Sequence, residues 1–141
     1  MNENLIQKFT PGFSESWEVV GSLPNYQHGY NVCAFLDKIY VLGGKFDEED
    51  RNRCFCFNPV TGENHDLPSM NEERQYGACV AFENKIFVFG GRSYIGPPTT
   101  YVRHRSVEVF DPEWKFVMSN MIKLRTHHKA VALKNKIFFR G

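Results

Sequence analysis

The chain has no long apolar segment and almost no net charge. Its 141 residues include 17 Lys and Arg against 16 Asp and Glu, which gives a formal charge of +1. No stretch approaches the ~18 apolar residues of a membrane-spanning helix, and no strong field of one sign could attract nucleic acid or an anionic membrane. We expect neither among the partners. Because the N-terminal stretch is polar and unlike a secretory leader, we expect a cytoplasmic location.

Motifs for catalysis or cofactor binding are also absent from the sequence. It contains no nucleophile elbow, phosphate-binding loop or paired-carboxylate motif. His127 and His128 are adjacent, and neighbouring strand residues point to opposite faces, which argues against one shared metal ion. We expect no enzyme activity, no cofactor and no metal site.

What the chain does contain is an internal repeat. The phrase Asp37–Gly44 returns as Asn84–Gly91 and starts again at Asn135–Gly141, at spacings of 47 and 51 residues. The unit junctions keep these offsets, in two sets of equivalent positions: Leu23, Met70 and Met121, then Gln27, Arg74 and Arg125. Matching anchors at both ends of the unit, repeated every 20–50 residues or so, are typical of stacked repeat architectures.

Cysteine is scarce, with only four residues, and the repeat explains each of them. Every cysteine aligns with a valine of the other repeat: Cys33 with Val80, Cys54 with Val107, Cys56 with Val109 and Cys79 with Val32. Small buried apolar side chains account for this pattern. We therefore expect no disulfides, as in a reducing compartment.

Each repeat reads as a four-stranded antiparallel sheet. Apolar runs over Tyr30–Leu36 and Ile39–Leu42 predict two strands joined by a tight turn at Asp37, a residue type that tolerates positive φ. Third strands are predicted at Arg53–Asn58 and Ser106–Asp111, and fourth strands near 63–67 and 115–119. The longest irregular stretch is expected at 92–105, and residues 1–16 are assigned no structure.

These residues resemble a Kelch-repeat β-propeller over roughly 17–141. The resemblance rests on the repeated phrase, the Phe-Asn-Pro and Phe-Asp-Pro turns, the junctions, and a set of repeat positions: Gly43, Gly44, Gly90, Gly91, Tyr40, Phe87 and Trp17. It implies an all-β partial propeller with about two complete four-stranded antiparallel blades and parts of the flanking blades. Residues 1–16 form an N-terminal flank, the repeats cover about 27–73 and 74–124, and a third begins at 125. The chain is thus expected to be a fragment.

Within that family the chain is most similar to the six-bladed Kelch-like subfamily, whose members usually carry BTB and BACK domains. The resemblance implies a protein-interaction module that recognises substrates for a cullin-type ubiquitin ligase. An actin-binding cytoskeletal role is the alternative, and a propeller enzyme is less favoured. Two and a half blades with unpartnered end faces are expected to be oligomeric, poorly soluble or partly unfolded.

The resemblance also implies that loops joining second to third strands, and blade to blade, bind the partner peptide. Candidate contact residues in these loops are Asp47, Glu48, Arg74, Tyr76, Arg92, Tyr94, Arg103, His104, Arg105, Arg125 and His127. The basic loop around Arg103 could clamp an acidic segment, although charged loops are often merely solvated. For Arg74 and Arg125, a structural role in pairing blades is favoured over partner contact.

Overall fold

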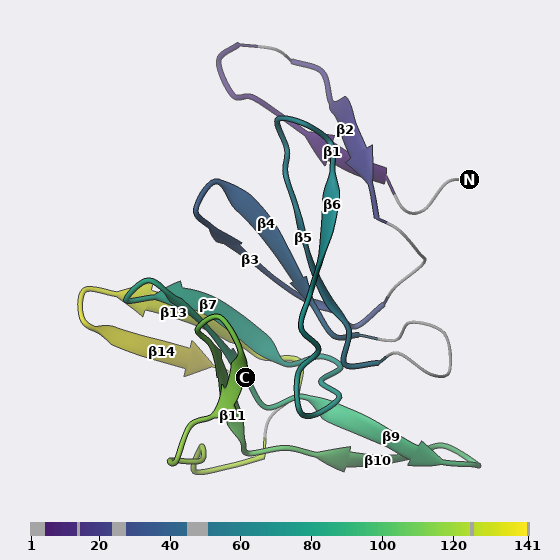
Figure 1. Cartoon of the computed structure of the whole chain (residues 1–141), viewed down its shortest axis with the longest axis vertical. Helices are drawn as coiled ribbons and strands as arrows, with labels where there is room; N and C mark the ends of the chain where they lie inside the picture. The colour runs from purple at the N-terminus through teal and green to yellow at the C-terminus, as the bar shows by residue number, and fades with distance from the viewer. Residues whose placement is uncertain (1–4, 14, 24–27, 45–50, 125, 141) are drawn as a thin grey trace.

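The regular structure of the protein is β throughout the described residues. The computed structural model describes residues 5–13, 15–23, 28–44, 51–124 and 126–140. Their strands form two four-stranded sheets and three two-stranded ones, all antiparallel (Figure 1). Among these residues, none belongs to a helix of the length and apolarity that crossing a membrane requires.

The two four-stranded sheets confirm the predicted blades. Blade one has the order β3 (Asn31–Phe35), β4 (Lys38–Leu42), β5 (Cys54–Phe57) and β6 (Asn64–Leu67). Blade two repeats it with β7 (Ala78–Phe82), β8 (Lys85–Phe89), β11 (Val107–Phe110) and β12 (Trp114–Phe116). The first strands β3, β7 and β13 (Lys129–Leu133) lie next to one another. Successive sheets therefore stack side by side, which is the arrangement of an all-β partial propeller.

Two of the two-stranded sheets are parts of flanking blades. At one end, β13 pairs with β14 (Lys136–Arg140), and at the other β1 (Leu5–Lys8) pairs with β2 (Glu18–Ser22). The strand β1 corrects the expectation that residues 1–16 lack regular structure. Phe9-Thr10-Pro11 directly follows β1, and the similar Phe57-Asn58-Pro59 begins at the last residue of β5, so the sequence held a further copy of the third-strand turn.

Tight turns join the first two strands of each blade. Leu36 and Asp37 have φ of 49° and 59°, and Glu83 and Asn84 have φ of 47° and 62°. Two consecutive residues with positive φ are the mark of a type I′ turn, whose twist matches that of the flanking strands. Asp and Asn were the predicted turn residues because their side chains tolerate this conformation.

The hydrophobic core is divided into layers between the blades. Between blades one and two lie Tyr40, Leu42, Cys54, Ile86 and Val88, all under a tenth exposed. A second layer, between blade two and β13–β14, includes Phe89, Val107, Ala130 and Phe139. A third layer, between blade one and the segment that follows β2, includes Leu23, Val41 and Phe55. Alternate residues of each strand therefore face opposite neighbours, which explains why these strands are apolar on both faces.

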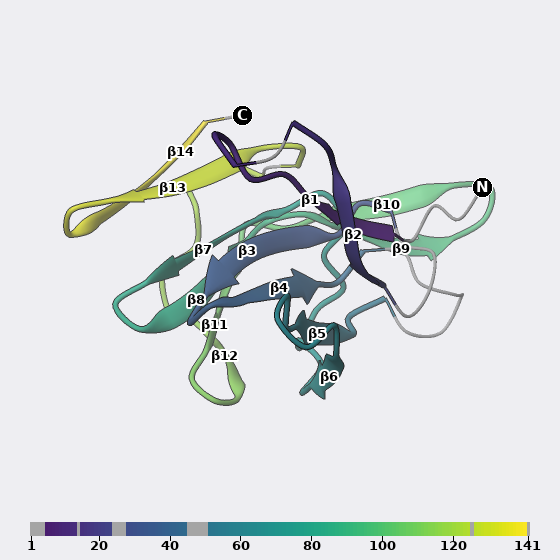
Figure 2. The same ribbon diagram turned by 90° about the horizontal axis from the view of Figure 1, so that it is seen from above.

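Two sequence expectations are corrected. The stretch 92–105 is a β-hairpin, with β9 (Arg92–Gly96) paired to β10 (Thr100–Arg103), rather than an irregular loop. In Figures 1 and 2 this hairpin projects on the side opposite the β7–β8 and β13–β14 turns. The fourth strand of blade two begins at Trp114, before the predicted 115–119. Trp114 fixes that register because its indole Nε1 donates to the carbonyl of Pro68 at 2.8 Å.

Candidate partner-binding face

The hairpin is held against the connection between the two complete blades. The main-chain groups of Gln75 and Arg92 exchange two hydrogen bonds of 2.9 Å each. The Ser93 hydroxyl donates to the carbonyl of Glu73 at 2.9 Å, and the amide of His104 donates to the carbonyl of Gly91 at 2.9 Å. These bonds fix the base of the hairpin, so its side chains are presented from a positioned element rather than a free loop.

One face of the hairpin carries alternating arginine and tyrosine. The Arg92 guanidinium lies 3.9 Å from the ring centre of Tyr101 and 5.0 Å from that of Tyr76. Tyr94 packs edge-on against Tyr101 with centroids 5.7 Å apart, and Arg51 of blade one lies 4.4 Å over the Tyr94 ring. Such cation–π contacts contribute about 0.5–2 kcal/mol each, depending on desolvation. They tie the hairpin to both blades.

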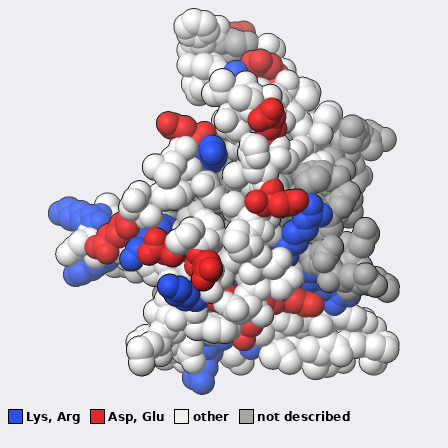
Figure 3. Space-filling view, viewed as in Figure 1, with Lys and Arg blue, Asp and Glu red and all other residues white. Residues whose placement is uncertain are grey.

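Other hairpin side chains are left accessible. Arg103 at the end of β10 and Arg105 two residues later are exposed, and Ile95 and Val102 are 60% and 44% exposed. Val102 pairs with Ser93, so Ile95 and Val102 lie on the face of the hairpin opposite Arg103. Exposed arginine is among the residue types enriched in protein-binding surfaces. Figure 3 shows charges of both signs interspersed over the face drawn there, so any attraction is local rather than a field of the whole molecule.

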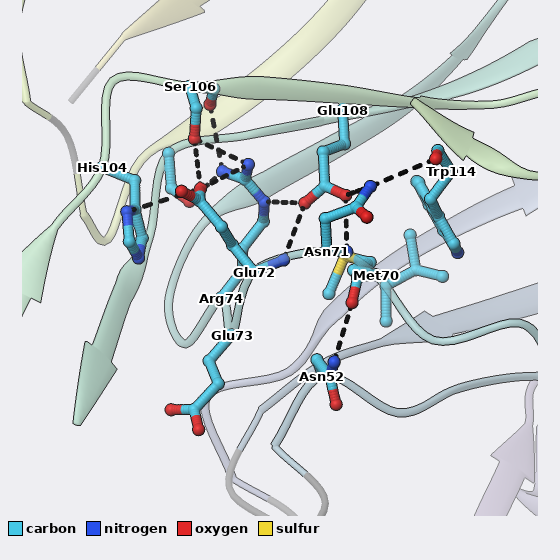
Figure 4. A network of polar contacts seen from close by, with 12 residues as sticks. Asn52, Met70, Asn71, Glu72, Glu73, Arg74, His104, Ser106, Glu108 and Trp114 are labelled. Atoms are coloured by element: carbon cyan, nitrogen blue, oxygen red, sulfur yellow. Dashed lines mark hydrogen bonds and ion pairs between the residues drawn. The ribbon is translucent and has the colours of Figure 1, made fainter. Parts of the chain in front are cut away.

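Arg74 is not part of the accessible surface. Its side chain is fully buried. Its guanidinium contacts the carboxylate of Glu108 at 2.9 Å and that of Glu72 at 3.0 Å (Figure 4). It also donates to the carbonyls of Gly90 at 2.8 Å and Ser106 at 3.0 Å. All these partners belong to blade two or to the segment that leads into it. A buried arginine whose donors all have such partners stabilises the fold and is not available to an external ligand.

The main chain of Arg74 reaches the other blade. The side-chain amide of Asn31, on β3, donates to the Arg74 carbonyl at 2.9 Å and to the Leu42 carbonyl at 3.0 Å. Arg74 thus joins blade one through its backbone and blade two through its side chain. This geometry favours the structural role expected for the position.

Glu108 completes the buried network. Its carboxylate accepts from the amide of Asn71 at 2.7 Å and from the Asn71 side chain at 2.9 Å, in addition to Arg74 (Figure 4). The Asn71 side chain also donates to the Trp114 carbonyl at 3.1 Å. A buried carboxylate with an arginine and several donors is satisfied. The network therefore fixes the connection between blades.

His104 links this network to the hairpin. One ring nitrogen lies 2.6 Å from the Ser93 hydroxyl and the other lies 3.5 Å from the Glu72 carboxylate. Burial lowers the pKa of His104, and the nearby Glu72 carboxylate only partly opposes that effect. The ring is therefore neutral at physiological pH, and it acts as a packing and hydrogen-bonding group at the base of the hairpin.

Gly29, Tyr76 and His127 occupy equivalent positions of successive repeats and are linked by backbone hydrogen bonds; we call this chain of bonds the stair. The amide of Tyr76 donates to the carbonyl of Gly29 at 2.7 Å, and the amide of His127 donates to the carbonyl of Tyr76 at 2.6 Å. All three have positive φ, between 56° and 69°. The Tyr76 and His127 rings stack with centroids 4.2 Å apart, and a Cβ on Gly29 would lie 2.9 Å from the Tyr76 ring.

The structure brings part of the predicted contact set together. Contacts join Arg92 to Tyr76, Tyr94 to Tyr101 and His104 to Ser93, and Arg103 is the strand partner of Arg92. His127 adjoins this group by stacking on Tyr76. Arg105 follows the hairpin and is exposed. Asp47, Glu48 and Arg125 lie outside the described residues.

The repeat positions occupy different environments. Tyr40 is buried and Phe87 half-buried, whereas Trp17 is 66% exposed. At Gly44 and Gly91, φ is 95° and 85°, and an added Cβ would lie 2.9 Å from the Tyr30 nitrogen and the Gln75 oxygen, respectively. Gly43 and Gly90 precede them with φ of 65° and 61°. Only glycine combines that conformation with such close approach.

Sequence reasoning missed Glu108, Ser106 and Arg51. A signal for Glu108 was present, because the equivalent position in the first repeat is Phe55, while Arg74 replaces Gln27. The second repeat therefore gains a positive and a negative charge that the first repeat lacks, which suggests that the two form an ion pair. Within the described residues, no group of His, Cys, Asp and Glu is arranged to hold a metal ion.

The comparisons with known proteins agree with this architecture. The family model described as the Kelch motif matches residues 28–71 and 73–121. Kelch-like protein 23 of Homo sapiens is 27% identical over 125 residues, covering 86% of this chain and 21% of that protein. Spermatocyte protein spe-26 of Caenorhabditis elegans is 30% identical over 142 residues, covering 96% and 25%.

Two further matches add another relative and a solved structure. Alpha-scruin of Limulus polyphemus is 25% identical over 135 residues, covering 90% of this chain and 14% of that protein. The solved structure of YjhT superposes with a TM-score of 0.79 at 14% identity, covering 95% of this chain and 43% of that one. The chain spans a quarter or less of the length of these three relatives.

Proposed function

Because the chain belongs to the family of Kelch-repeat proteins, we propose that it binds a protein partner at the face carrying the β9–β10 hairpin. Kelch repeats indicate a protein-interaction module, and the hairpin gives that module a specific surface. The observation that carries the proposal is that the exposed Arg103 and Arg105 lie beside a cluster of arginine and tyrosine side chains whose contacts fix the hairpin. Because the hairpin is already held in place, less conformational entropy is lost when a partner binds to it.

The partner segment that suits this surface is acidic. Arginine binds carboxylates in a two-point geometry, and Arg103 and Arg105 are both exposed. We further propose that the protein recognises substrates in the manner of an adaptor for a cullin-type ubiquitin ligase, in the cytoplasm. The alternative is binding to actin. No catalytic step forms part of either proposal.

Charge reversal tests the surface. We expect an immobilised protein to retain acidic peptides from a library, and the double variant Arg103→Glu/Arg105→Glu to weaken that retention at least tenfold. Lys115→Glu, an exposed lysine on the outer strand β12, is the matched control and should bind as the unmodified protein does. Raising the salt concentration should weaken binding as well. An unchanged peptide profile after the double reversal would remove the hairpin as the binding surface.

The two partner classes separate in a second experiment. Co-sedimentation with actin filaments measures the cytoskeletal alternative, and capture of acidic peptides measures the substrate-recognition role. Sedimentation with filaments that survives Arg103→Glu/Arg105→Glu, without acidic peptide capture, favours the actin role.

A further inference from the structure

Cys33 and Cys79 face each other between blades one and two. Both side chains pack in the apolar layer that joins these blades, and both thiols are free. They belong to the first strands β3 and β7, which lie next to one another. The two thiols form a hydrogen bond, so no other group separates the sulfur atoms. The pair therefore spans the contact between the two complete blades.

The repeat explains why these two positions meet. Cys33 aligns with Val80, whose side chain packs in the layer between blade two and β13–β14. The equivalent of Cys79 in the third repeat is Ala130, which packs in that same layer. Valine and alanine thus fill the corresponding pair of positions at the next contact between sheets. Small apolar side chains are enough for packing there, so the fold does not require two thiols.

The remaining cysteines are less suited to reaction. Cys54 and Cys56 are buried on β5, and the strand β4 separates them from Cys33, with Tyr40 between Cys33 and Cys56. Burial raises the pKa of Cys54 to about 12. The hydrogen bond from Cys79 instead lowers the pKa of the half-buried Cys33. Because the thiolate is the reactive form of cysteine, an oxidant should attack Cys33 first.

A cavity of about 150 Å³ adjoins the pair, and its walls include Cys79, Asn31 and Gly77. Asn31 is 3% exposed, and within the described part of the chain its Oδ1 has no hydrogen-bond partner. This oxygen lies beside Gly77, since a Cβ built there would be 3.1 Å away from it. The cavity can hold water-sized molecules, and a molecule with O–H groups would satisfy the buried acceptor. Hydrogen peroxide has both properties.

We propose that Cys33 and Cys79 form a reversible disulfide when the protein is exposed to hydrogen peroxide. First, the Cys33 sulfur attacks one peroxide oxygen and the O–O bond breaks. Cys33 becomes a sulfenic acid, and the other oxygen leaves with the Cys33 proton as water. The Cys79 sulfur then attacks the sulfenic sulfur, whose hydroxyl leaves with the Cys79 proton as a second water. Two thiols are thus oxidised to one disulfide, and one peroxide is reduced to two waters.

Cellular thiols make the bond reversible. Two molecules of a thiol such as glutathione reduce it by thiol–disulfide exchange and restore the free pair. While it is present, the bond closes a loop from residue 33 to residue 79, which contains most of blade one and the connection to blade two. Such a loop limits the conformations of the unfolded chain. Oxidation should therefore make the contact between the two blades more resistant to unfolding.

Thiol titration and peptide mapping test the bond. The chain has four cysteines, so titration in urea after treatment with a small excess of hydrogen peroxide should detect two thiols in place of four. Peptide mapping without reductant should identify a link between residues 33 and 79, and dithiothreitol should restore all four thiols. Four thiols after peroxide, a link between other cysteines, or a disulfide-linked dimer would refute the proposal.

Substitutions taken from the repeat separate the two steps. Cys79→Ala copies Ala130 and removes the second thiol, so peroxide should leave Cys33 as a sulfenic acid that dimedone labels. Cys33→Val copies Val80 and should abolish both the link and the dimedone adduct. Circular dichroism of each variant establishes that the fold persists. An unlabelled Cys33 in folded Cys79→Ala would overturn its assignment as the thiol that peroxide attacks.

Cys56→Val is the matched control, because valine stands at this position in the second repeat. It removes a cysteine from the same apolar layer and should form the link as the unmodified protein does. Peroxide should also raise the urea midpoint of the unmodified protein and of Cys56→Val, but not that of Cys33→Val. An equal rise in Cys33→Val would mean that another modification causes it, and would contradict the proposed bond.

Discussion

Arg74 and Glu108 form a fully desolvated ion pair, with the guanidinium Nε and a carboxylate oxygen 2.9 Å apart. Removing one member of such a pair leaves the other charge buried without a counter-charge, which costs about 3–5 kcal/mol. We predict a loss of that size in the free energy of unfolding for Arg74→Gln and for Glu108→Gln, measured by urea denaturation.

The control for that prediction is the exposed pair between Arg53 and Asp66, whose atoms are 2.8 Å apart. Arg53→Gln should cost no more than about 1 kcal/mol, because water screens the pair. The first repeat has Gln27 and Phe55 at the positions of Arg74 and Glu108. The double variant Arg74→Gln/Glu108→Phe should therefore lose less stability than the sum of its two single variants. Equal losses for Arg53→Gln and Glu108→Gln would contradict this view of the network.

His104 should make stability depend on pH. Its pKa in the folded protein lies below the ordinary value of 6.5, chiefly because the ring is buried. As the pH falls below about 6.5, the unfolded chain takes up this proton first. Stability therefore falls with pH until the folded histidine is also protonated. We expect the thermal midpoint of His104→Asn to decline less steeply than that of the unmodified protein between about pH 7 and pH 5.5; parallel slopes would count against the assignment.

Gly29 should resist substitution because of its neighbour as well as its backbone. Its φ is 69°, and an alanine Cβ would lie 2.9 Å from the Tyr76 ring. Gly12 is a matched control, with φ of 75° and no atom within 4 Å of a built Cβ. Left-handed backbone strain costs about 1–2 kcal/mol in both variants. Thermal denaturation should show a larger loss for Gly29→Ala than for Gly12→Ala, and equal losses would mean that the ring moves aside freely.

The cysteines should differ in reactivity. Burial raises the pKa of Cys54 to about 12, so almost none of it is thiolate at pH 8. A hydrogen bond with the Cys79 thiol lowers the pKa of Cys33, which is also more exposed. Iodoacetamide labelling followed by mass spectrometry should modify Cys33 first, and Cys54 only after urea is added. Rapid labelling of Cys54 in the folded protein would be inconsistent with its burial.

The blades could be predicted from the sequence because their local and long-range signals coincide. Positions 37 and 84 carry turn-forming Asp and Asn, and the strands beside them are apolar on both faces because blades cover both sides. The repeat then reinforced each assignment, since a strand found in one unit predicted its equivalent in the next.

The hairpin and β1 were missed for different physical reasons. The segment that forms the hairpin is longer than the segment at the same place in the first repeat, so the repeat did not predict its strands. Its strands are short, and Pro97-Pro98 between them indicates a loop. The strand β1 has only four residues, and it is defined by pairing with β2 rather than by its own composition. The Arg74–Glu108 contact joins residues 34 positions apart, so single-strand patterning contains no direct sign of it.

The Gly29–Tyr76–His127 stair implies that each blade is positioned against its neighbour by its own backbone hydrogen bond. The same kind of backbone hydrogen bond joins residues 47 positions apart in the first step and 51 positions apart in the second. The longer second unit contains the β9–β10 hairpin, and the backbone bond of its step is kept. An insertion between the second and third strands of a blade can therefore lengthen a unit without breaking the backbone bond that joins it to its neighbour.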